Sequence, residues 1–359
     1  MPQRTNILFL VPYPERRAPS QRFRVELFEP YLAEAGIPYT ISPFLDAPTW
    51  DVLYKEGNSG KKIAGILKGY LRRIKNALWD VRKYSHVFIH REAAPLGPPI
   101  FEWIIARLWR KKVIYDFDDA IWIPNTSSQN KIASLLKANW KVKHICRWSA
   151  TVTAGNEYLA AFAAKHNNNV TLLPTCVDVE QGHSKIKEHR TDSIIIGWTG
   201  SHSTLPFLDA LVPVLKELHS EMNFTLLVIA DKKPDYDIPA LMYIPWREDT
   251  EIEDLLHTDI GIMPLTPDAW SEGKCGFKLI QYLALGIPAV ASPVGVNRQI
   301  IEPGVNGYLA ASPAEWKTYL LQLMKDTEVR KKMGAAGRQK MVSGYSTQSM
   351  KERFLGLFR

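Results

Sequence analysis

Three carboxylates fall within four residues of one another in the stretch YDFDD, residues 115–119, directly after an apolar run. Asp116 and Asp118 would lie on one side of an extended chain, because successive side chains of a strand alternate. Clustered carboxylates repel one another, so we expect a raised pKa for at least one of them. That suits acid–base chemistry or the binding of substrate hydroxyls. Two other interpretations stay open: a polar loop with a helix-capping aspartate, and a DxD-type metal site.

A second candidate site lies in SEGKCGFKLIQ, where a glycine-bearing loop leads into an apolar helix. A helix N-terminus has free N–H groups and a partial positive charge that favour phosphate. The glycines let the backbone approach a ligand, and the lysines add the charge that a diphosphate needs. Solvated lysines are the alternative, since neither GxxxxGK[ST] nor GxGxxG is present. The residues expected at this site are Lys274, Gly276, Phe277, Lys278, Gln281 and, from the next turn, Gly295.

Further polar side chains follow two of the apolar runs in the first half of the chain. Ser20, Arg22 and Arg24 begin a helix after the first run, where they could bind an acidic acceptor or a donor phosphate. A solvated helix face explains them equally well. His90 and Arg91 end the run HVFIH, and the favoured interpretation there is a histidine whose hydrogen bonds are satisfied at a strand end.

The elements between these residues alternate between strand-like and helix-like segments. The strands, such as ILFLV, HVFIH and KVIY, are continuously apolar, as is typical of parallel strands covered on both faces. A polar stretch at 180–193 looks like an interdomain linker, and the pattern restarts after it. The sequence therefore predicts an α/β protein with two Rossmann-like, doubly wound domains, residues 1–180 and 181–344. A final helix at about 345–359 is expected to pack back on the first domain.

Composition limits the function classes. With 359 residues, 46% apolar residues and three scattered cysteines, the chain is expected to be a cytoplasmic protein with free thiols. No apolar run is long enough to span a bilayer. The net charge of +8 favours phosphate-rich partners. Zinc-finger, RNP and helix-turn-helix signatures are missing, so no nucleic-acid partner is expected.

One basic segment, residues 61–83, holds eight Lys or Arg residues and one acid. At 100° per residue it forms an amphipathic helix with an apolar stripe, and its basic residues and two glycines, Gly65 and Gly69, lie on the other side. The stripe either packs on the protein core or meets anionic lipid headgroups. Tryptophans among basic residues in the first half, such as Trp103 and Trp140, keep a membrane-surface acceptor plausible.

Residues 276–297 resemble the donor-site signature of retaining glycosyltransferases of the GT-B fold, the large group often called family 4. LALGIPAVASPVGVN matches the later part of that signature, and EPGVNGYL matches the glycine turn that follows it. LLPTCVD is similar to the family's interdomain segment, and IGWTGS to its first C-domain strand and turn. The resemblance covers most of the chain, and it implies two domains facing a central cleft.

Two departures from the family pattern concern the donor. The two signature glutamates align with Gly273 and Gln281. Glu272, one position away, is expected to take over the contact with the donor sugar, and Gln281 to hydrogen-bond the ribose. The family's usual arginine and lysine after the first C-domain strand are replaced by short residues whose N–H groups and hydroxyls are expected to bind the diphosphate: Gly200, Ser201 and His202.

The resemblance also assigns roles in the first domain. In the family the strand equivalent to KVIY often ends in a His-Asp pair that faces the donor sugar, and Asp118 stands where the histidine would be. Asp118 is therefore the first candidate for the group that contacts the donor sugar or the acceptor hydroxyl. The predicted catalytic set is Asp118, Asp116 and Glu272, and the predicted acceptor-side set is Ser20, Arg22, Arg24 and Asp119.

Together these features predict a glycosyltransferase that moves a sugar from a nucleotide-diphosphate sugar to a saccharide or glycolipid acceptor. Retention of configuration follows from the resemblance, as does a role in envelope polysaccharide synthesis. No metal and no cofactor are predicted, because the lysines and the helix start can neutralise the diphosphate. A sugar-nucleotide epimerase or hydrolase, an inactive sugar-nucleotide-binding protein and a nucleic-acid-binding protein remain the alternatives. Association with the inner face of the membrane through residues 61–83 also stays open.

Overall fold

The structure, a computed structural model, describes residues 5–53, 55, 57–124, 137–189 and 193–359. The chain forms two compact units. Unit 1 comprises Met1–Thr175 and Lys351–Arg359, and unit 2 comprises Cys176–Met350. The first boundary follows residue 175, where the sequence analysis placed it after residue 180. The returning segment starts at residue 351, where 345 was expected.

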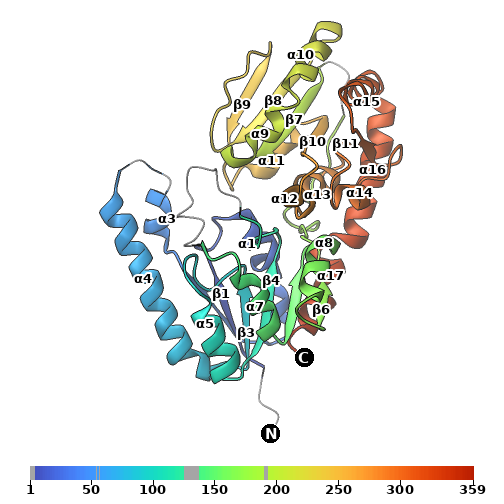
Figure 1. Cartoon of the computed structure of the whole chain (residues 1–359). Coiled ribbons are helices and arrows are strands. Elements are labelled where there is room, and N and C mark those ends of the chain that lie inside the picture. Colours follow the sequence, from blue (N-terminus) through green and yellow to red (C-terminus); the bar gives the residue numbers. More distant parts are fainter. Residues whose placement is uncertain (1–4, 54, 56, 125–136, 190–192) are drawn as a thin grey trace. The chain divides into compact units, whose positions relative to one another are not determined.

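Unit 1 is built on a parallel sheet of six strands in the order β2-β1-β3-β4-β5-β6 (Figure 1). Every residue of β1 and β3 is buried, as the continuous apolar runs predicted. Helices cover both faces of the sheet. The strands are β1 (Ile7–Val11), β2 (Tyr39–Pro43), β3 (His86–His90), β4 (Lys112–Phe117), β5 (Thr151–Ala154) and β6 (Val170–Leu172).

The helices of unit 1 connect these parallel strands. They are α1 (Pro19–Arg24), η1 (Glu26–Phe28), α2 (Glu29–Glu34), α3 (Ala47–Leu53), α4 (Ser59–Leu78), η2 (Asp80–Lys83), α5 (Ile100–Trp103), η3 (Ile104–Leu108), α7 (Lys141–Trp148) and α8 (Glu157–Ala164). The chain returns to this unit through α17 (Thr347–Gly356), where Phe354 stacks on Phe28 with ring centroids 4.2 Å apart. Phe358 adds an edge contact with Phe9 of β1. These aromatic contacts bury the last residues of the chain in the core of unit 1.

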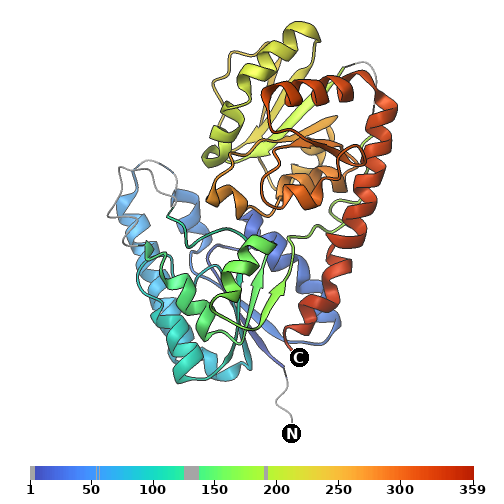
Figure 2. The ribbon, with the colours of Figure 1, turned by 45° about the vertical axis from the view of Figure 1, so that its right-hand side comes forward.

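Helix α4 lies along one side of unit 1 (Figure 2), and the interpretation in which its apolar stripe packs on the protein core is wrong for most of the stripe. Its glycine side is the buried one: a Cβ on Gly65 would lie 2.2 Å from Thr49 Oγ1, and one on Gly69 would lie 2.8 Å from the Phe44 ring. Arg73 on that side is fully buried and donates to the carbonyls of Ala93 and Val11. The glycines thus allow close approach to the unit, and much of the apolar stripe faces outward. None of the described helices is long and apolar enough to cross a membrane.

Unit 2 repeats the architecture with a second six-stranded parallel sheet, in the order β12-β11-β10-β7-β8-β9. Its core includes the fully buried Trp198 and is closed by residues of α10, α15 and α16. The sequence analysis missed two short edge strands, β9 and β12. The strands are β7 (Ile195–Gly200), β8 (Thr225–Ala230), β9 (Leu241–Pro245), β10 (Ile260–Met263), β11 (Ala289–Ala291) and β12 (Gly307–Leu309).

The helices of unit 2 are η4 (His202–Thr204), α9 (Leu205–Asp209), α10 (Val212–Glu221), α11 (Glu251–Leu256), α12 (Ala269–Glu272), α13 (Phe277–Ala284), α14 (Asn297–Ile300), α15 (Pro313–Lys325) and α16 (Thr327–Gly344). The sequence analysis took the stretch 180–193 for a linker, but residues 180–189 are fastened to this unit. Lys187 Nζ pairs with Asp259 at 3.1 Å, and His189 Nε2 lies 3.0 Å from the Gly286 carbonyl. Residues 190–192 of that stretch lie outside the described residues. Two α/β units with parallel sheets confirm the predicted fold class.

Candidate functional site

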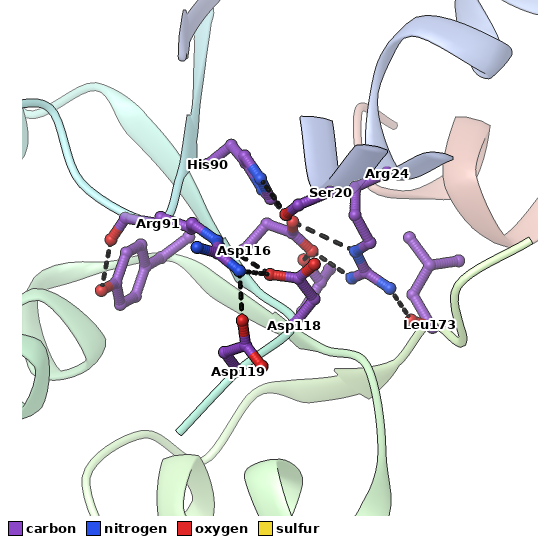
Figure 3. A network of polar contacts seen from close by, with 10 residues as sticks. Ser20, Arg24, His90, Arg91, Asp116, Asp118, Asp119 and Leu173 are labelled. Atoms are coloured by element: carbon purple, nitrogen blue, oxygen red, sulfur yellow. Dashed lines mark hydrogen bonds and ion pairs between the residues drawn. The ribbon is translucent and has the colours of Figure 1, made fainter. Parts of the chain in front are cut away.

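Seven charged or polar side chains meet at one edge of the unit 1 sheet (Figure 3). They follow or end neighbouring parallel strands, and the carboxyl ends of such strands are where ligands bind in open α/β sheets. α1 follows β1, His90 ends β3, and the aspartates end or follow β4. We call this group the Asp118 cluster: Ser20, Arg24, His90, Arg91, Asp116, Asp118 and Asp119.

Asp116 is the buried centre of the Asp118 cluster. Its Oδ2 lies 2.7 Å from His90 Nδ1, its Oδ1 accepts from Thr153 Oγ1 at 2.7 Å, and the guanidinium of Arg24 pairs with both oxygens. Arg24 also donates to the Leu173 carbonyl. With no exposed surface, Asp116 cannot contact a substrate directly. The structure therefore makes Asp116 and Arg24 positioning residues, where the sequence analysis placed them in the catalytic and acceptor sets.

Ser20 connects the buried Asp116 side of the cluster to Asp118. Its Oγ lies 2.9 Å from His90 Nε2, while Nδ1 of the same ring faces Asp116. Ser20 also hydrogen-bonds Asp118. The result is a continuous chain Asp116–His90–Ser20–Asp118 along which a proton can be held or moved, in the manner of a base oriented by a third group. His90 is thus part of the cluster, although the sequence analysis did not include it among the predicted site residues.

Asp118 and Asp119 share one arginine. Arg91 Nε donates to Asp118 Oδ1 at 2.9 Å, and its terminal nitrogen donates to Asp119. Arg91 has a positive φ of 61°, a conformation that costs energy for a residue with a side chain and that clusters at functional sites. The side-chain hydroxyl of Tyr115 donates to the Arg91 carbonyl at 2.7 Å and holds it there. Arg91 thus bridges Asp118 and Asp119 while Arg24 pairs with Asp116, so each of the three carboxylates has an arginine beside it.

The expectation of a raised pKa in this cluster is wrong for Asp116 and Asp118. Burial alone would raise the pKa of each, but the positive charges outweigh it. Arg24 and His90 lower the pKa of Asp116 below its ordinary value. Arg91, His90 and Arg24 hold the pKa of Asp118 well below its usual range. Both aspartates are therefore ionised at neutral pH, and Asp118, with 11% of its side chain exposed, presents a carboxylate acceptor to a ligand.

The predicted phosphate-binding residues of unit 2 collect at the carboxyl ends of its central strands. β7, β10 and β11 are neighbours, so the segments that follow them share one edge of the sheet. Helix α13 begins there at Gly276, which has a φ of 69°, with Phe277 and Lys278 in its first turn. Lys278 Nζ lies 5.3 Å from the centre of the Trp198 ring, and Lys274 Nζ lies 4.9 Å from that of Trp270. Both ammonium groups are thereby held near a helix N-terminus.

The turn after β7 lies at the same edge. Gly200 ends the strand, and Ser201 caps the turn η4 through a reciprocal bond pair with Thr204. The His202 backbone N–H and ring both face Asp231, at 2.5 and 2.6 Å. Gly200 and Ser201 thus lie at the same edge of the sheet as the start of α13, and His202 faces a carboxylate.

Glu272 and Gly295 come together although 23 residues separate them. Gly295 has a φ of 53°, and a Cβ there would lie 2.8 Å from the Glu272 backbone carbonyl. The Glu272 carboxylate lies 3.4 Å from Arg298 and keeps 31% of its side chain exposed. The close approach fixes Glu272 at the same edge of the sheet as Lys274.

Gln281 departs from its predicted role. Its side chain is buried, and Nε2 donates to Glu251 Oε1 at 2.5 Å inside unit 2. Gln281 lies about one turn after the start of α13, but its side chain points into unit 2. This direction does not fit the predicted hydrogen bond to a ribose. Arg22, in the acceptor-side set, is partly exposed and lies over the Phe23 ring, 5.0 Å from its centre.

The sequence analysis missed two residues that shape these sites, Trp198 and Trp270. They gave no signal, because an aromatic in a strand or a short helix looks like core. His90 and Arg91 were named but left out of the predicted site, although parallel pairing of HVFIH with KVIYDF places them beside Asp116. Among the described residues, no group of three or more His, Cys, Asp or Glu side chains is arranged to hold a metal ion.

Comparisons with known proteins agree with this architecture. Residues 236–340 match the family described as glycosyl transferases group 1. A glycosyltransferase from Rickettsia africae is similar with a TM-score of 0.69 and 14% identity, covering 99% of this chain and 98% of that one. Sucrose-phosphate synthase from Thermosynechococcus elongatus is similar with a TM-score of 0.67 and 13% identity, covering 99% of this chain and 98% of that one. Anabaena Alr3699/HepE has the same TM-score and identity, covering 98% of each chain. No curated protein matches the sequence.

The matched residues 236–340 contain the helix start at Gly276, both lysines and Glu272. At 13–14% identity the likeness to the solved structures establishes the fold, and the family match covers the predicted donor residues from Lys274 to Gly295. The chain thus has the GT-B fold of these solved structures, and residues 236–340 of its second unit match the glycosyl transferases group 1 family.

Proposed function

We propose that the protein transfers a sugar from a nucleotide-diphosphate sugar to a saccharide or lipid-linked acceptor in glycan assembly, such as that of envelope polysaccharides. The observation that carries the proposal is the start of α13, where Gly276, Lys278 and the Trp198 ring lie together at the carboxyl edge of the unit 2 sheet. Solved structures of Anabaena HepE hold UDP, glucose or UDP-glucose, which supports the same class of donor. A structure of TarM with UDP and α-GlcNAc-glycerol supports a saccharide acceptor.

The donor would be held by unit 2. When the bond between the anomeric carbon and the diphosphate oxygen breaks, negative charge grows on the leaving diphosphate. Lys274, Lys278 and the N–H groups at the start of α13 are preorganised to meet that charge. These groups supply the neutralisation that a divalent cation gives elsewhere, so we propose a metal-independent reaction.

The acceptor would be held by unit 1 at Asp118. A carboxylate with a lowered pKa is a weak base but a good hydrogen-bond acceptor, so Asp118 orients the acceptor hydroxyl rather than removing its proton. The proton then leaves with the diphosphate oxygen as the new glycosidic bond forms. Delivery from the face that the diphosphate leaves gives retention of configuration, which the resemblance to family 4 enzymes favours.

A lipid-linked acceptor would place the reaction at the cytoplasmic face of a membrane. The basic character of residues 61–83 and the net charge of +8 support this location. An epimerase or hydrolase would need no second substrate, so dependence on an acceptor distinguishes these activities from glycosyl transfer.

The first test is thermal stabilisation by a panel of nucleoside diphosphates and nucleotide sugars, comparing the wild type with Lys278→Ala. A ligand at a hundredfold excess over its Kd adds about 2.7 kcal/mol, which raises the melting midpoint visibly. We expect one diphosphate to stabilise the wild type and Lys278→Ala far less. Lys325→Ala, an exposed lysine at the end of α15, is the matched control and should behave as wild type.

The second step uses the diphosphate found in that panel. Release of the nucleoside diphosphate from its sugar should require an acceptor, should persist with a chelator present and should fall strongly in Asp118→Ala. Release without any acceptor would indicate a hydrolase. Failure of every nucleotide to stabilise the wild type would refute donor binding at the start of α13.

A further inference from the structure

Nine of the thirteen large hydrophobic side chains that are exposed among the described residues belong to one part of unit 1. They lie on or beside α4, α5 with η3, and α7, and the other four are scattered over unit 2. α4 contacts α5 and η3, and α5 contacts α7, so these helices form one layer along the sheet (Figures 1 and 2). We call their outward side the α4–α7 face.

The apolar part of the α4–α7 face is a ridge along α4. Four residues at helical spacing point outward: Ile63 (58% exposed), Leu67 (59%), Leu71 (67%) and Ile74 (39%). Such a stripe normally packs on a core, but in α4 the opposite, glycine-bearing side does so. Burial of these four side chains against a binding partner would therefore contribute favourable free energy to binding.

Charge on the α4–α7 face has one sign. Lys61, Lys68 and Lys75 are exposed on one flank of the α4 ridge, and Arg107 and Arg147 are exposed on the neighbouring helices. Within 59–78, 100–108 and 141–148 the single carboxylate is Glu102, which is buried. Two of these lysines have a carboxylate beside them: Lys68 Nζ lies 2.7 Å from Asp46, and Lys75 Nζ lies 4.0 Å from Asp80. An apolar ridge with a flank of cations and buried acids complements an anionic surface.

Two indoles complete the pattern. Trp103 in α5 is 46% exposed, and Trp140, directly before α7, is 51% exposed. Tryptophan is favoured at the boundary between lipid headgroups and acyl chains, and lysine stems can lie on apolar surface while the ammonium reaches the headgroups. A protein partner fits less well, because lysine is depleted in protein–protein interfaces.

We propose that the α4–α7 face docks on an anionic phospholipid membrane, with the α4 ridge inserted among the headgroups and the lysines on the lipid phosphates. Helix α4 follows β2, so its first turn lies toward the carboxyl edge of the sheet, where the Asp118 cluster is. This orientation brings the cluster close to a lipid-linked acceptor. In that respect the inference rests on the proposed function, whereas the docking itself does not depend on catalysis.

The test is sedimentation of the full chain with vesicles of phosphatidylglycerol and phosphatidylcholine, and with pure phosphatidylcholine, at low and high salt. We expect binding to the anionic vesicles that weakens with salt, and little binding to the neutral ones. The double variant Leu67→Glu, Leu71→Glu should bind roughly tenfold or more weakly, because two carboxylates replace the exposed apolar ridge. Both side chains are exposed, so the melting midpoint should stay unchanged.

The matched control is Val342→Glu, which changes an exposed apolar residue of α16 that is 44% exposed, and it should bind as the wild type does. Equal binding of the ridge variant and the wild type would overturn the proposal. So would a wild-type dimer that the ridge variant converts to a monomer without any vesicle binding, since the face would then join two copies of the chain. Nucleotide stabilisation measured on the same samples reports the proposed function separately: its failure with vesicle binding intact leaves docking standing.

Discussion

The two polar sites of this protein are built on opposite principles. In unit 1 the Asp118 cluster neutralises its charges internally: two arginines and His90 face three aspartates, and Asp116 and Arg24 have no exposed surface. In unit 2 the cations Lys274 and Lys278 lie over indole rings and stay partly exposed. One site is a closed network with a carboxylate at its rim, and the other presents positive charge beside a helix start.

The difference teaches what each site is suited to do. A buried ion-pair network is costly to dismantle, so it fixes geometry, here the position of Asp118 and Ser20. Ammonium groups on aromatic faces keep the positive charge that attracts an anion. Unit 1 should therefore be sensitive to substitution in its stability, and unit 2 in its ligand binding.

The largest effect is expected from Asp116→Ala. Removing this carboxylate leaves the guanidinium of Arg24 and the His90 ring buried without their common partner. Breaking one side of a buried pair typically costs about 3–5 kcal/mol. Urea unfolding should show that loss, whereas Asp249→Ala, from an exposed pair with Arg247, should show no measurable change. Equal behaviour of the two variants would mean that the network does not stabilise unit 1.

Gly295→Ala should have the next largest effect, on unit 2. Its positive φ costs about 1–2 kcal/mol for any residue with a Cβ, and here the Cβ would also press on the Glu272 backbone. Gly304→Ala is the control, because Gly304 has a φ of 78° with nothing within 4 Å of the new Cβ. We expect both variants to lose stability, and Gly295→Ala alone to lose nucleotide-dependent stabilisation. Nucleotide-dependent stabilisation retained in Gly295→Ala would show that Glu272 does not have to stay in place.

The third prediction concerns the pH dependence of stability that Asp118 gives to unit 1. The pKa of Asp118 is lowered in the folded state, so its contribution to stability is complete above its unfolded pKa of about 3.9 and disappears as the pH falls toward the folded value. The wild type should thus lose free energy of unfolding between about pH 5 and 3, and Asp118→Asn should lose less by on the order of 1 kcal/mol. Asp237→Asn, at a fully exposed position, should keep the wild-type slope. A steeper slope in Asp118→Asn would contradict the sign derived from its partners.

The sequence predicted the sites better than it predicted the direction of individual side chains. Apolar runs and glycine turns located the two sheets, and parallel strands necessarily bring Asp116, Asp118 and His90 to one edge. Helical periodicity failed at α4, because the glycine side, which looked polar, allows the closer approach. The predicted direction of the Gln281 side chain was wrong for a related reason. Its position along the helix was clear, but the buried acceptor Glu251, 30 residues away, determines where the side chain points. Long-range partners of this kind leave no local signal.

The smallest effect concerns the ring under Lys274. Trp270→Leu removes a cation–π contact at a partly exposed site, worth about 0.5–1 kcal/mol. Nucleotide affinity, measured by calorimetric titration, should fall roughly two- to fivefold, and Trp79→Leu, an exposed tryptophan of unit 1, should leave it unchanged. A loss as large as that of Lys278→Ala would assign the ring a different role, stacking directly on the nucleotide base. Trp270 would then belong to the donor contacts themselves, and the unit 2 site would be partly aromatic rather than purely cationic.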